Sequence, residues 1–444
     1  ELLSTLHTTL KSEDKEQLES FVADRLPSEL AEMLNLCHKE DRINVISALG
    51  EYGPEILPEM FSYLDSEVKE QVISLIGTID SAEAIGKLES DEAVQFVEDL
   101  SEEKISEILR ELPHHKRVEL KNSLSFPEDS AARIANRQFV TVGKGKQVGD
   151  IIDFLRSSED LPQDFYTIFI LDDEQKPVSF VPLSRIMRNR REVDIDQLSE
   201  EIIKAIDLNT DQEEVANIFQ KYGLISAPVV DSEGKIFGVI TIDDVANVIE
   251  EEVQEDIMHL AGLKPESDIL SEPFKKFKNR SPWLLVNLVT SILASLVISL
   301  FEGEIQSLVA LAVLMPIVAS MSGNAGSQTL TVAVRALATK ELMGSNYYKI
   351  LNKELLSSLI NGIIFGSVVF LASYLLYSNL SLGIIIFTAV ILTFLLASLS
   401  GLTIPIIMNR MGFDPAVSSS ALVYAITDMS SFFIFLGLAS LLLI

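Results

Sequence analysis

The sequence predicts a multidomain protein with an all-α superhelical N-terminal domain, tandem α/β domains, a connecting helix and a five-helix α transmembrane domain. Charge is confined to one part of the chain, since residues 1–282 hold 30 basic and 59 acidic residues and residues 283–444 hold only 5 and 6. Five apolar stretches in the second part are long enough to cross a bilayer. A helix–strand–turn–strand–helix pattern occurs twice in the first part. The expected divisions are 1–137, 138–199, 200–253, 254–281 and 282–444.

Short amphipathic helices fill residues 1–137. They are punctuated by recurring starts such as Leu26-Pro27, Leu57-Pro58 and Leu112-Pro113. Proline suits the first turn of a helix, where its missing N–H has no intrahelical partner. Regular punctuation of this kind predicts a stack of short helix pairs.

The two α/β units share one order of elements. The first has strands at 166–171 and 177–181 around a polar turn, and the second has a helix at 211–222 and strands at 227–230 and 236–240. In tandem they resemble a pair of cystathionine-β-synthase (CBS) domains, a regulatory module.

One segment of the second unit has two alternative roles. Gly238–Asp244 resembles the strand-to-helix segment with which some CBS domains bind adenosine nucleotides, which would place ATP against Thr241 and Asp243. Thr241 followed three residues later by Asp244 is also a variant capping box. The cap is favoured, because the first copy, Val181–Arg185, lacks the acidic residue.

A helix is expected to continue from Glu250 through an acidic stretch and to end at Phe274–Lys278, next to the membrane. It would connect the regulatory units to the spans. The net charge of −29 over residues 1–282 repels nucleic acid and attracts cations, so no nucleic-acid partner is expected.

The five predicted spans are 283–301, 305–334, 355–377, 380–408 and 415–444. The basic connections all fall on one side, which places the soluble part in the cytoplasm and the C-terminus outside. The expected location is the plasma membrane of a bacterium, with the lipid bilayer as a partner.

The second span contains an unusual segment, Met315–Gln328. Pro316 removes a backbone donor, and Gly323 and Gly326 permit either close helix approach or a local break. Asn324 lies four residues before Gln328, so their amides share a helix face. A kinked helix that packs on its neighbour is the alternative to an ion-coordinating role.

Asp428 is the only ionisable residue well inside a predicted span, thirteen residues beyond Pro415. Burying a charge there costs roughly 2.5–3.5 kcal/mol on insertion scales, and such residues usually mark ion paths. No Lys or Arg lies at similar depth, so a mobile cation is the expected partner. Oxygen ligands without thiol or imidazole suit a hard ion, and one Asp per chain in a symmetric dimer suits hydrated Mg²⁺. Asp414, before Pro415, is predicted to cap the last helix.

Together these features resemble the MgtE family of magnesium channels and transporters, related to solute carrier family 41. The most specific matches are Pro316 to Gln328 and Gly412-Phe413-Asp414-Pro415-Ala416 through Asp428. The resemblance implies a homodimer in which Asp428, Asn324 and the Gly323 backbone hold hydrated Mg²⁺. It also implies that cytosolic Mg²⁺ binds between the soluble domains and closes the gate. The implied sensor residues are Asp91, Glu92, Asp211, Glu213, Asp244, Glu252, Glu255 and Asp256.

The chain departs from the family pattern at several positions. Ala421, Tyr424 and Ala425 replace a proline and a threonine pair, Ser431 replaces a glycine, and Gln95 and Asn247 replace sensor carboxylates. A secondary divalent-cation transporter coupled to Na⁺ or H⁺ is therefore the alternative to a Mg²⁺ channel. An enzyme is not expected, since the spans contain no nucleophile–base pair.

Overall fold

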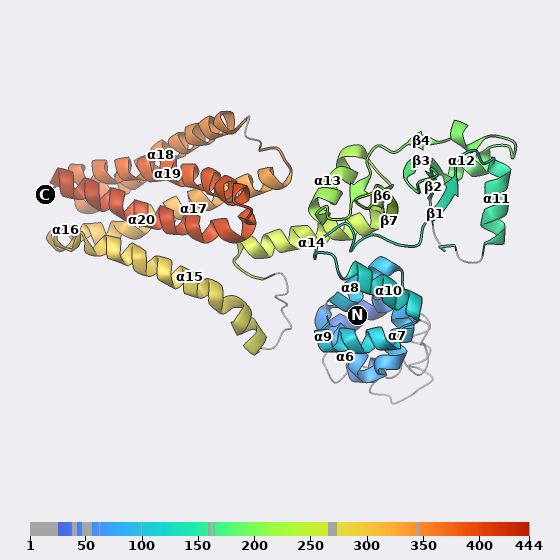
Figure 1. The fold of residues 1–444 in the computed structure, drawn as a ribbon. Coiled ribbons are helices and arrows are strands. Elements are labelled where there is room, and N and C mark those ends of the chain that lie inside the picture. Colours follow the sequence, from blue (N-terminus) through green and yellow to red (C-terminus); the bar gives the residue numbers. More distant parts are fainter. Residues whose placement is uncertain are drawn as a thin grey trace. The chain divides into compact units, whose positions relative to one another are not determined.

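The computed structural model describes residues 25–37, 42–46, 56–61, 63–98, 100–158, 161–162, 165–264, 273–342 and 346–443. The chain divides into two units, Glu1–Ile249 and Glu250–Ile444, which are described separately (Figure 1).

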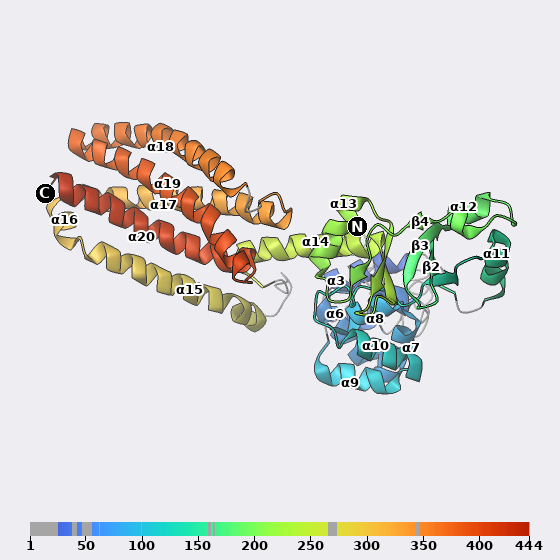
Figure 2. The same ribbon diagram turned by 45° about the horizontal axis from the view of Figure 1, so that its top comes forward.

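The first unit begins with a group of short helices (Figure 2). These are α3 (Pro27–Leu36), α5 (Leu57–Phe61), α6 (Ser66–Ile76), α7 (Thr78–Lys87), α8 (Ser90–Glu98), α9 (Glu102–Glu111) and α10 (His114–Ser123). Their apolar faces form one core, in which the Phe61 and Phe96 rings are fully buried and stack with centroids 4.3 Å apart. The predicted all-helical domain is confirmed, and α3 has a proline in its first turn as expected.

Two small sheets follow. The first α/β unit contains β1 (Val140–Gly143), α11 (Val148–Ser157), β2 (Thr167–Leu171), β3 (Pro177–Pro182), α12 (Leu183–Arg188), a 3₁₀ turn at Ile195–Gln197 and β4 (Glu200–Glu201). The second contains β5 (Ile206–Asp207), α13 (Gln212–Tyr222), β6 (Ser226–Val230), β7 (Ile236–Thr241) and the start of α14 (Ile242–Leu260). In both sheets the first and second strands pair parallel, and the second and third pair antiparallel, which confirms the predicted repeat.

Residues just before the first α/β unit belong to the core of the second. Ala131 and Ala135 are buried in that core, and bridges join Ser130 to Asp211 and Asn136 to Val239. These residues thus pack with the second α/β unit, whereas the predicted division at 137 groups them with the helical domain. Short alanine side chains fill this space, and they leave no periodic signal in the sequence.

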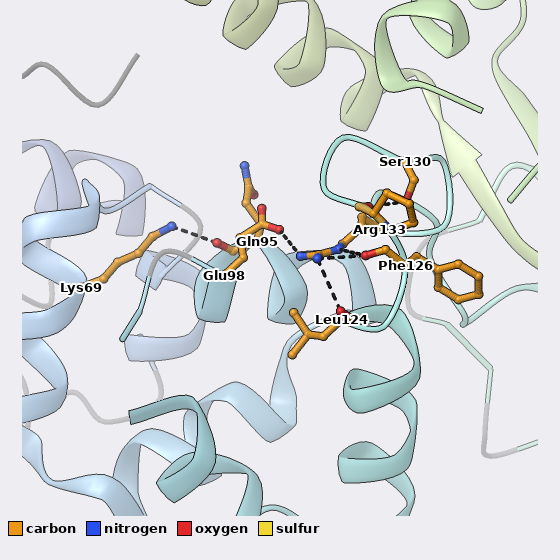
Figure 3. A network of polar contacts seen from close by, with 8 residues as sticks. Lys69, Gln95, Glu98, Leu124, Phe126, Ser130 and Arg133 are labelled. Carbon is orange, nitrogen blue, oxygen red and sulfur yellow. Dashed lines mark hydrogen bonds and ion pairs between the residues drawn. The ribbon is translucent and has the colours of Figure 1, made fainter. Parts of the chain in front are cut away.

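Arg133 fastens this segment to the helical domain (Figure 3). Its Nη1 lies 3.0 Å from Glu98 Oε2 on α8, and its Nε donates to the Phe126 carbonyl at 3.1 Å. Nη2 donates to the carbonyls of Leu124 and Phe126. One largely buried guanidinium thus holds three chain segments together.

The second unit contains five helices long and apolar enough to cross a membrane, as predicted. They are α15 (Pro273–Ser299), α17 (Ala310–Ala338), α18 (Tyr347–Tyr377), α19 (Leu380–Arg410) and α20 (Pro415–Leu443), with a short α16 (Glu302–Ser307) before α17. Helices α17, α19 and α20 share a buried core.

The range predicted as a connecting helix, 254–281, covers parts of two helices. Helix α14 ends at Leu260, and the next helix, α15, begins at Pro273 and continues into the first span. Gly262 has a φ of 70°, in the left-handed region where helices commonly end.

Helix α17 is continuous through Pro316, so the local break considered above does not occur in it. The alternative, close helix approach, is what the structure shows. A Cβ on Gly401 of α19 would lie 2.7 Å from the Gly326 carbonyl oxygen of α17, so only glycine fits at this crossing.

Candidate functional site

Asp428 lies near the middle of α20 and is half-buried. Within the described part of the chain, its carboxylate has no hydrogen bond or ion pair. The neighbouring hydroxyls bond to their own helix instead, since Thr427 Oγ1 donates to the Val423 carbonyl at 2.9 Å and Ser431 Oγ to the Thr427 carbonyl at 2.6 Å. The protein therefore leaves this carboxylate available for a ligand.

Helix α17 brings the predicted glycine segment next to α20. A Cβ on Gly323 would be 3.8 Å from the Tyr424 ring, which lies one turn before Asp428, and one on Gly326 would be 3.0 Å from Thr427. Asn324 is exposed in this single chain. The structure thus places Gly323 beside the Asp428 helix, while no hydrogen bond between Asn324 and Asp428 occurs in the described residues.

Four of the replaced family positions lie on α20, the helix that carries Asp428. Ala421 and Ala425 are buried, and Ser431 is buried with its hydroxyl on its own helix. Tyr424 is 42% exposed and packs over Gly323, so its ring is the bulkiest of these departures.

A group of carboxylates, the α8–α14 cluster, gathers between the helical domain and the second α/β unit. Its members are Glu89, Asp91, Glu92, Asp243 and Asp244. Burial raises the pKa of Asp91 well above its usual range, and the charges of Asp244 and Glu89 add to that effect. Asp244 accepts hydrogen bonds from Thr241, yet burial still raises its pKa. The cluster therefore carries more negative charge than its surroundings stabilise.

Glu89 and Ser90 also belong to this region, and the sequence pattern does not predict them as site residues. Glu89 accepts from the Asn136 amide, and Ser90 Oγ accepts from the Arg137 N–H at 2.6 Å. Asn136 precedes the first α/β unit, 47 positions from Glu89. No local pattern predicts such a pairing, although Glu89 borders the predicted Asp91–Glu92 pair.

The predicted capping box at the start of α14 is present in part. Asp244 Oδ2 accepts from the Thr241 N–H at 3.1 Å, as the motif requires. The Thr241 hydroxyl does not accept from the helix; it donates to Asp244 at 2.6 Å and also bonds Asp243. Thr241 and Asp243 are thus engaged with the carboxylates of the cluster.

Asp211 and Glu213 lie at the start of α13. Asp211 is the N-cap and accepts from the Glu213 N–H at 2.9 Å. Asp129 lies close to Asp211, and its pKa is raised by burial and then by the Asp211 charge. Asp211, which the resemblance assigns to a sensor, is therefore a helix cap beside a second carboxylate.

A second charged group, the α14–α20 cluster, lies within the other unit and comprises Glu255, Asp256, His259 and Asp414. His259 Nδ1 is 3.2 Å from Asp414 Oδ2, and its Nε2 is 3.6 Å from Glu255 Oε1. Asp414 also caps α20 as predicted, since its Oδ1 accepts from the Ala416 N–H at 2.8 Å. Burial and the Asp414 charge raise the pKa of Asp256. Glu252 lies one turn before Asp256 on α14 and is half-buried.

The end of α14 also packs on the membrane helices. Leu260 contacts a buried group that includes Leu330 of α17 and Val423 of α20, and the Trp283 indole of α15 packs against Gly262. The last residue of α14 therefore contacts α20, the helix that carries Asp428.

No group of three or more His, Cys, Asp or Glu side chains in the described ranges is arranged to hold a metal ion on its own. Mg²⁺ does not require one, because it keeps several waters and binds through one or two carboxylates.

The comparisons with known proteins bear on the whole chain. Residues 315–438 match MgtE, a divalent cation transporter, residues 26–129 match the MgtE intracellular N domain, and residues 195–251 match a CBS domain. The magnesium transporter MgtE of Enterococcus faecalis is 30% identical over 323 residues, which cover 73% of this chain and 71% of the relative. The chain belongs to the MgtE family. It is thus a multi-pass membrane transport protein and not an enzyme, as predicted.

Further MgtE relatives agree with this assignment. The magnesium transporter MgtE of Thermus thermophilus is 27% identical over 425 residues, 89% of this chain and 94% of the relative. Among solved structures, the cytosolic domain of the Mg²⁺ channel MgtE in complex with ATP has a TM-score of 0.50 and 23% identity. It covers 55% of this chain and 99% of that chain, and the likeness supports the fold of the soluble part.

Proposed function

We propose that this MgtE protein conducts Mg²⁺ into the cell along a path that contains Asp428. The observation that carries the proposal is an unpartnered, half-buried carboxylate near the middle of a membrane-spanning helix. A fixed charge at that depth is costly unless an ion or water compensates it. Gly323 of α17 packs beside the same stretch of α20, so its backbone and the exposed Asn324 amide are the proposed additional ligands.

A symmetric dimer would complete the site. One carboxylate is a weak ligand set for a divalent ion, whereas two Asp428 carboxylates, with waters retained, suit hydrated Mg²⁺. The exposed side chains of Asn324 and Tyr424 lie on helices that a second copy could then cover.

The proposed orientation places the soluble domains in the cytoplasm and the C-terminus outside. Successive spans cross the membrane in opposite directions, so the start of α15 and the ends of α17 and α19 fall on one side. These three ends carry basic residues, namely Lys275 and Arg280, Arg335, and Arg410. Basic residues are enriched on the cytoplasmic side of membrane proteins.

The decisive experiment is Mg²⁺ flux into liposomes that contain Asp428→Asn. Flux should fall to background, because asparagine keeps the shape and removes the charge. Ser430→Ala, two residues away with a hydroxyl bonded to its own helix, should retain wild-type flux. Normal flux through Asp428→Asn contradicts the assignment. Flux of the wild type without a Na⁺ or H⁺ gradient separates a channel from a coupled transporter.

We further propose that cytosolic Mg²⁺ closes the path by binding at the α8–α14 and α14–α20 clusters. Each cluster holds carboxylates whose pKa is raised by burial and mutual repulsion, which a divalent cation would relieve. Helix α14 contributes to both clusters, and its end packs on α17 and α20. Mg²⁺ should therefore slow proteolysis of the soluble part, and an unchanged digestion pattern contradicts this sensing role.

ATP binding by the second CBS domain is proposed on narrower grounds. A solved cytosolic domain of the same fold is in complex with ATP. Thr241 and Asp243 are the predicted contacts here, although both already bond within the cap of α14. Calorimetric titration with ATP tests the proposal, and Asp243→Ala should abolish any binding seen. Absence of heat with the wild type contradicts it.

A further inference from the structure

The start of α15 carries an exposed group of cations that the transport path does not use. This basic patch comprises Lys275, Lys278 and Arg280, within the first two turns of the helix. It lies in a part of the chain where acidic residues outnumber basic ones by 59 to 30.

These charges are unfavourable for the helix itself. They lie at the positive end of the α15 dipole, and the first turn contains no acidic residue to offset them. Three like charges within six positions also repel one another. Anions bound along the patch would relieve both effects.

Two aromatic side chains accompany the patch. Phe274 and Phe277 are 78% and 63% exposed, with ring centroids 6.3 Å apart. Large exposed apolar rings beside Lys and Arg are typical of segments that lie at the surface of a membrane.

The depth of the patch agrees with this pattern. Arg280 and Phe274 lie three and nine positions before Trp283, where the apolar run begins. At 1.5 Å per residue this is roughly 5–14 Å from the start of the hydrocarbon core. The headgroup layer occupies about 5–8 Å on each side, so a tilted helix start lies within or against it.

We propose that the basic patch binds the headgroups of anionic phospholipids, with the two phenylalanine rings inserted beside them. Phosphate groups are the anions available at that depth, and Lys and Arg are their usual ligands. The acidic soluble part would be repelled by the same anionic surface. The patch therefore anchors the one helix start through which the soluble part joins the spans.

The single tryptophan of the chain provides the assay, since Trp283 is three residues beyond the patch. The full-length protein is reconstituted in phosphatidylcholine with a minor fraction of phosphatidylglycerol, and one lipid at a time carries bromine, which quenches indole fluorescence. Brominated phosphatidylglycerol should quench Trp283 as if enriched about fivefold per cation engaged. Higher salt should reduce this enrichment in the wild type.

Variants test the residues. In the triple variant Lys275→Gln, Lys278→Gln and Arg280→Gln, the two brominated lipids should quench Trp283 fluorescence equally. The control Lys349→Gln with Lys353→Gln, on exposed positions of α18, should keep the wild-type preference. Equal quenching by both lipids in the wild type overturns the proposal and favours pairing of the patch with the acidic stretch of α14. A preference that survives in the triple variant, or that ignores salt, overturns it as well.

Discussion

Replacement of Asp91 by asparagine tests whether repulsion in the α8–α14 cluster makes the soluble part depend on Mg²⁺. Asparagine keeps the size of the side chain and removes one of five carboxylate charges. The Asp91 Oδ1 atom is buried without a hydrogen-bond partner, and the hydrogen bond between Asp91 and Asp244 is one that an asparagine amide can donate. We therefore expect the Mg²⁺-free protein to hold its helical domain against the second CBS domain more tightly than wild type does.

The size of the effect follows from the environment of Asp91. Removing a buried, poorly compensated polar charge changes a local equilibrium by about 1–3 kcal/mol. That corresponds to about 5–150-fold in the ratio of closed to open forms. Mg²⁺ should then add less protection to the variant, because both a ligand and the repulsion that the ion relieves are absent.

The pH dependence has a definite sign. Burial raises the pKa of Asp91 and of Asp244 in the closed form, so the closed form binds more protons than the open one. Closure without Mg²⁺ should therefore be strongest at low pH and weaken as pH rises through the raised values. The variant should show a flatter pH profile.

Limited proteolysis of the full-length protein, with and without Mg²⁺ and at several pH values, measures both effects. Asp80→Asn, an exposed position on α7, is the matched control and should behave like wild type. Equal digestion of Asp91→Asn and wild type under every condition refutes the reasoning. Faster digestion of the Mg²⁺-free variant also refutes it.

Two glycine substitutions test the packing of the membrane unit. Gly401→Ala should destabilise the α17–α19 crossing by about 1–3 kcal/mol through overpacking and lower the yield of folded protein. Gly303→Ala is the control and should be tolerated, because its added Cβ has no atom within 4 Å. Equal yields of the two variants contradict the close crossing. Gly262→Ala costs about 1–2 kcal/mol because its backbone is left-handed, and the added methyl group clashes with Trp283. Because this change disrupts the joint between α14 and α15, flux should persist at Mg²⁺ concentrations that close the wild type. Gly145→Ala carries a similar φ without a close neighbour and serves as its control; identical gating of the two variants argues against coupling through this joint.

The sequence predicts the elements of this fold better than their connections. Apolar runs define five spans, and Leu-Pro starts define several short helices, because both signals are local. The ends of the connecting region are less well predicted. Continuous apolar and charged patterns do not reveal that α14 ends at Leu260, since that depends on one left-handed glycine.

The candidate sites show the same limit. The insertion cost of Asp428 is a property of one residue, so its importance can be inferred from sequence alone. Asp244 interacts with Asp91 from about 150 residues away, and Asn136 bonds the adjacent Ser90 from 46 residues away, so no periodicity predicts their meeting. His259 and Asp414 are likewise 155 positions apart and meet only in the folded unit.

The position of Ala131 and Ala135 in the core of the second CBS domain limits the travel of the helical domain. Helix α10 ends at Ser123, so only about seven residues separate it from this fixed point. A fully extended chain of that length reaches roughly 25 Å. While Ala131 and Ala135 stay docked, the helical domain can move only as far as this short connection allows. A soluble fragment that begins at residue 138 would leave an unfilled cavity in the core of the second CBS domain.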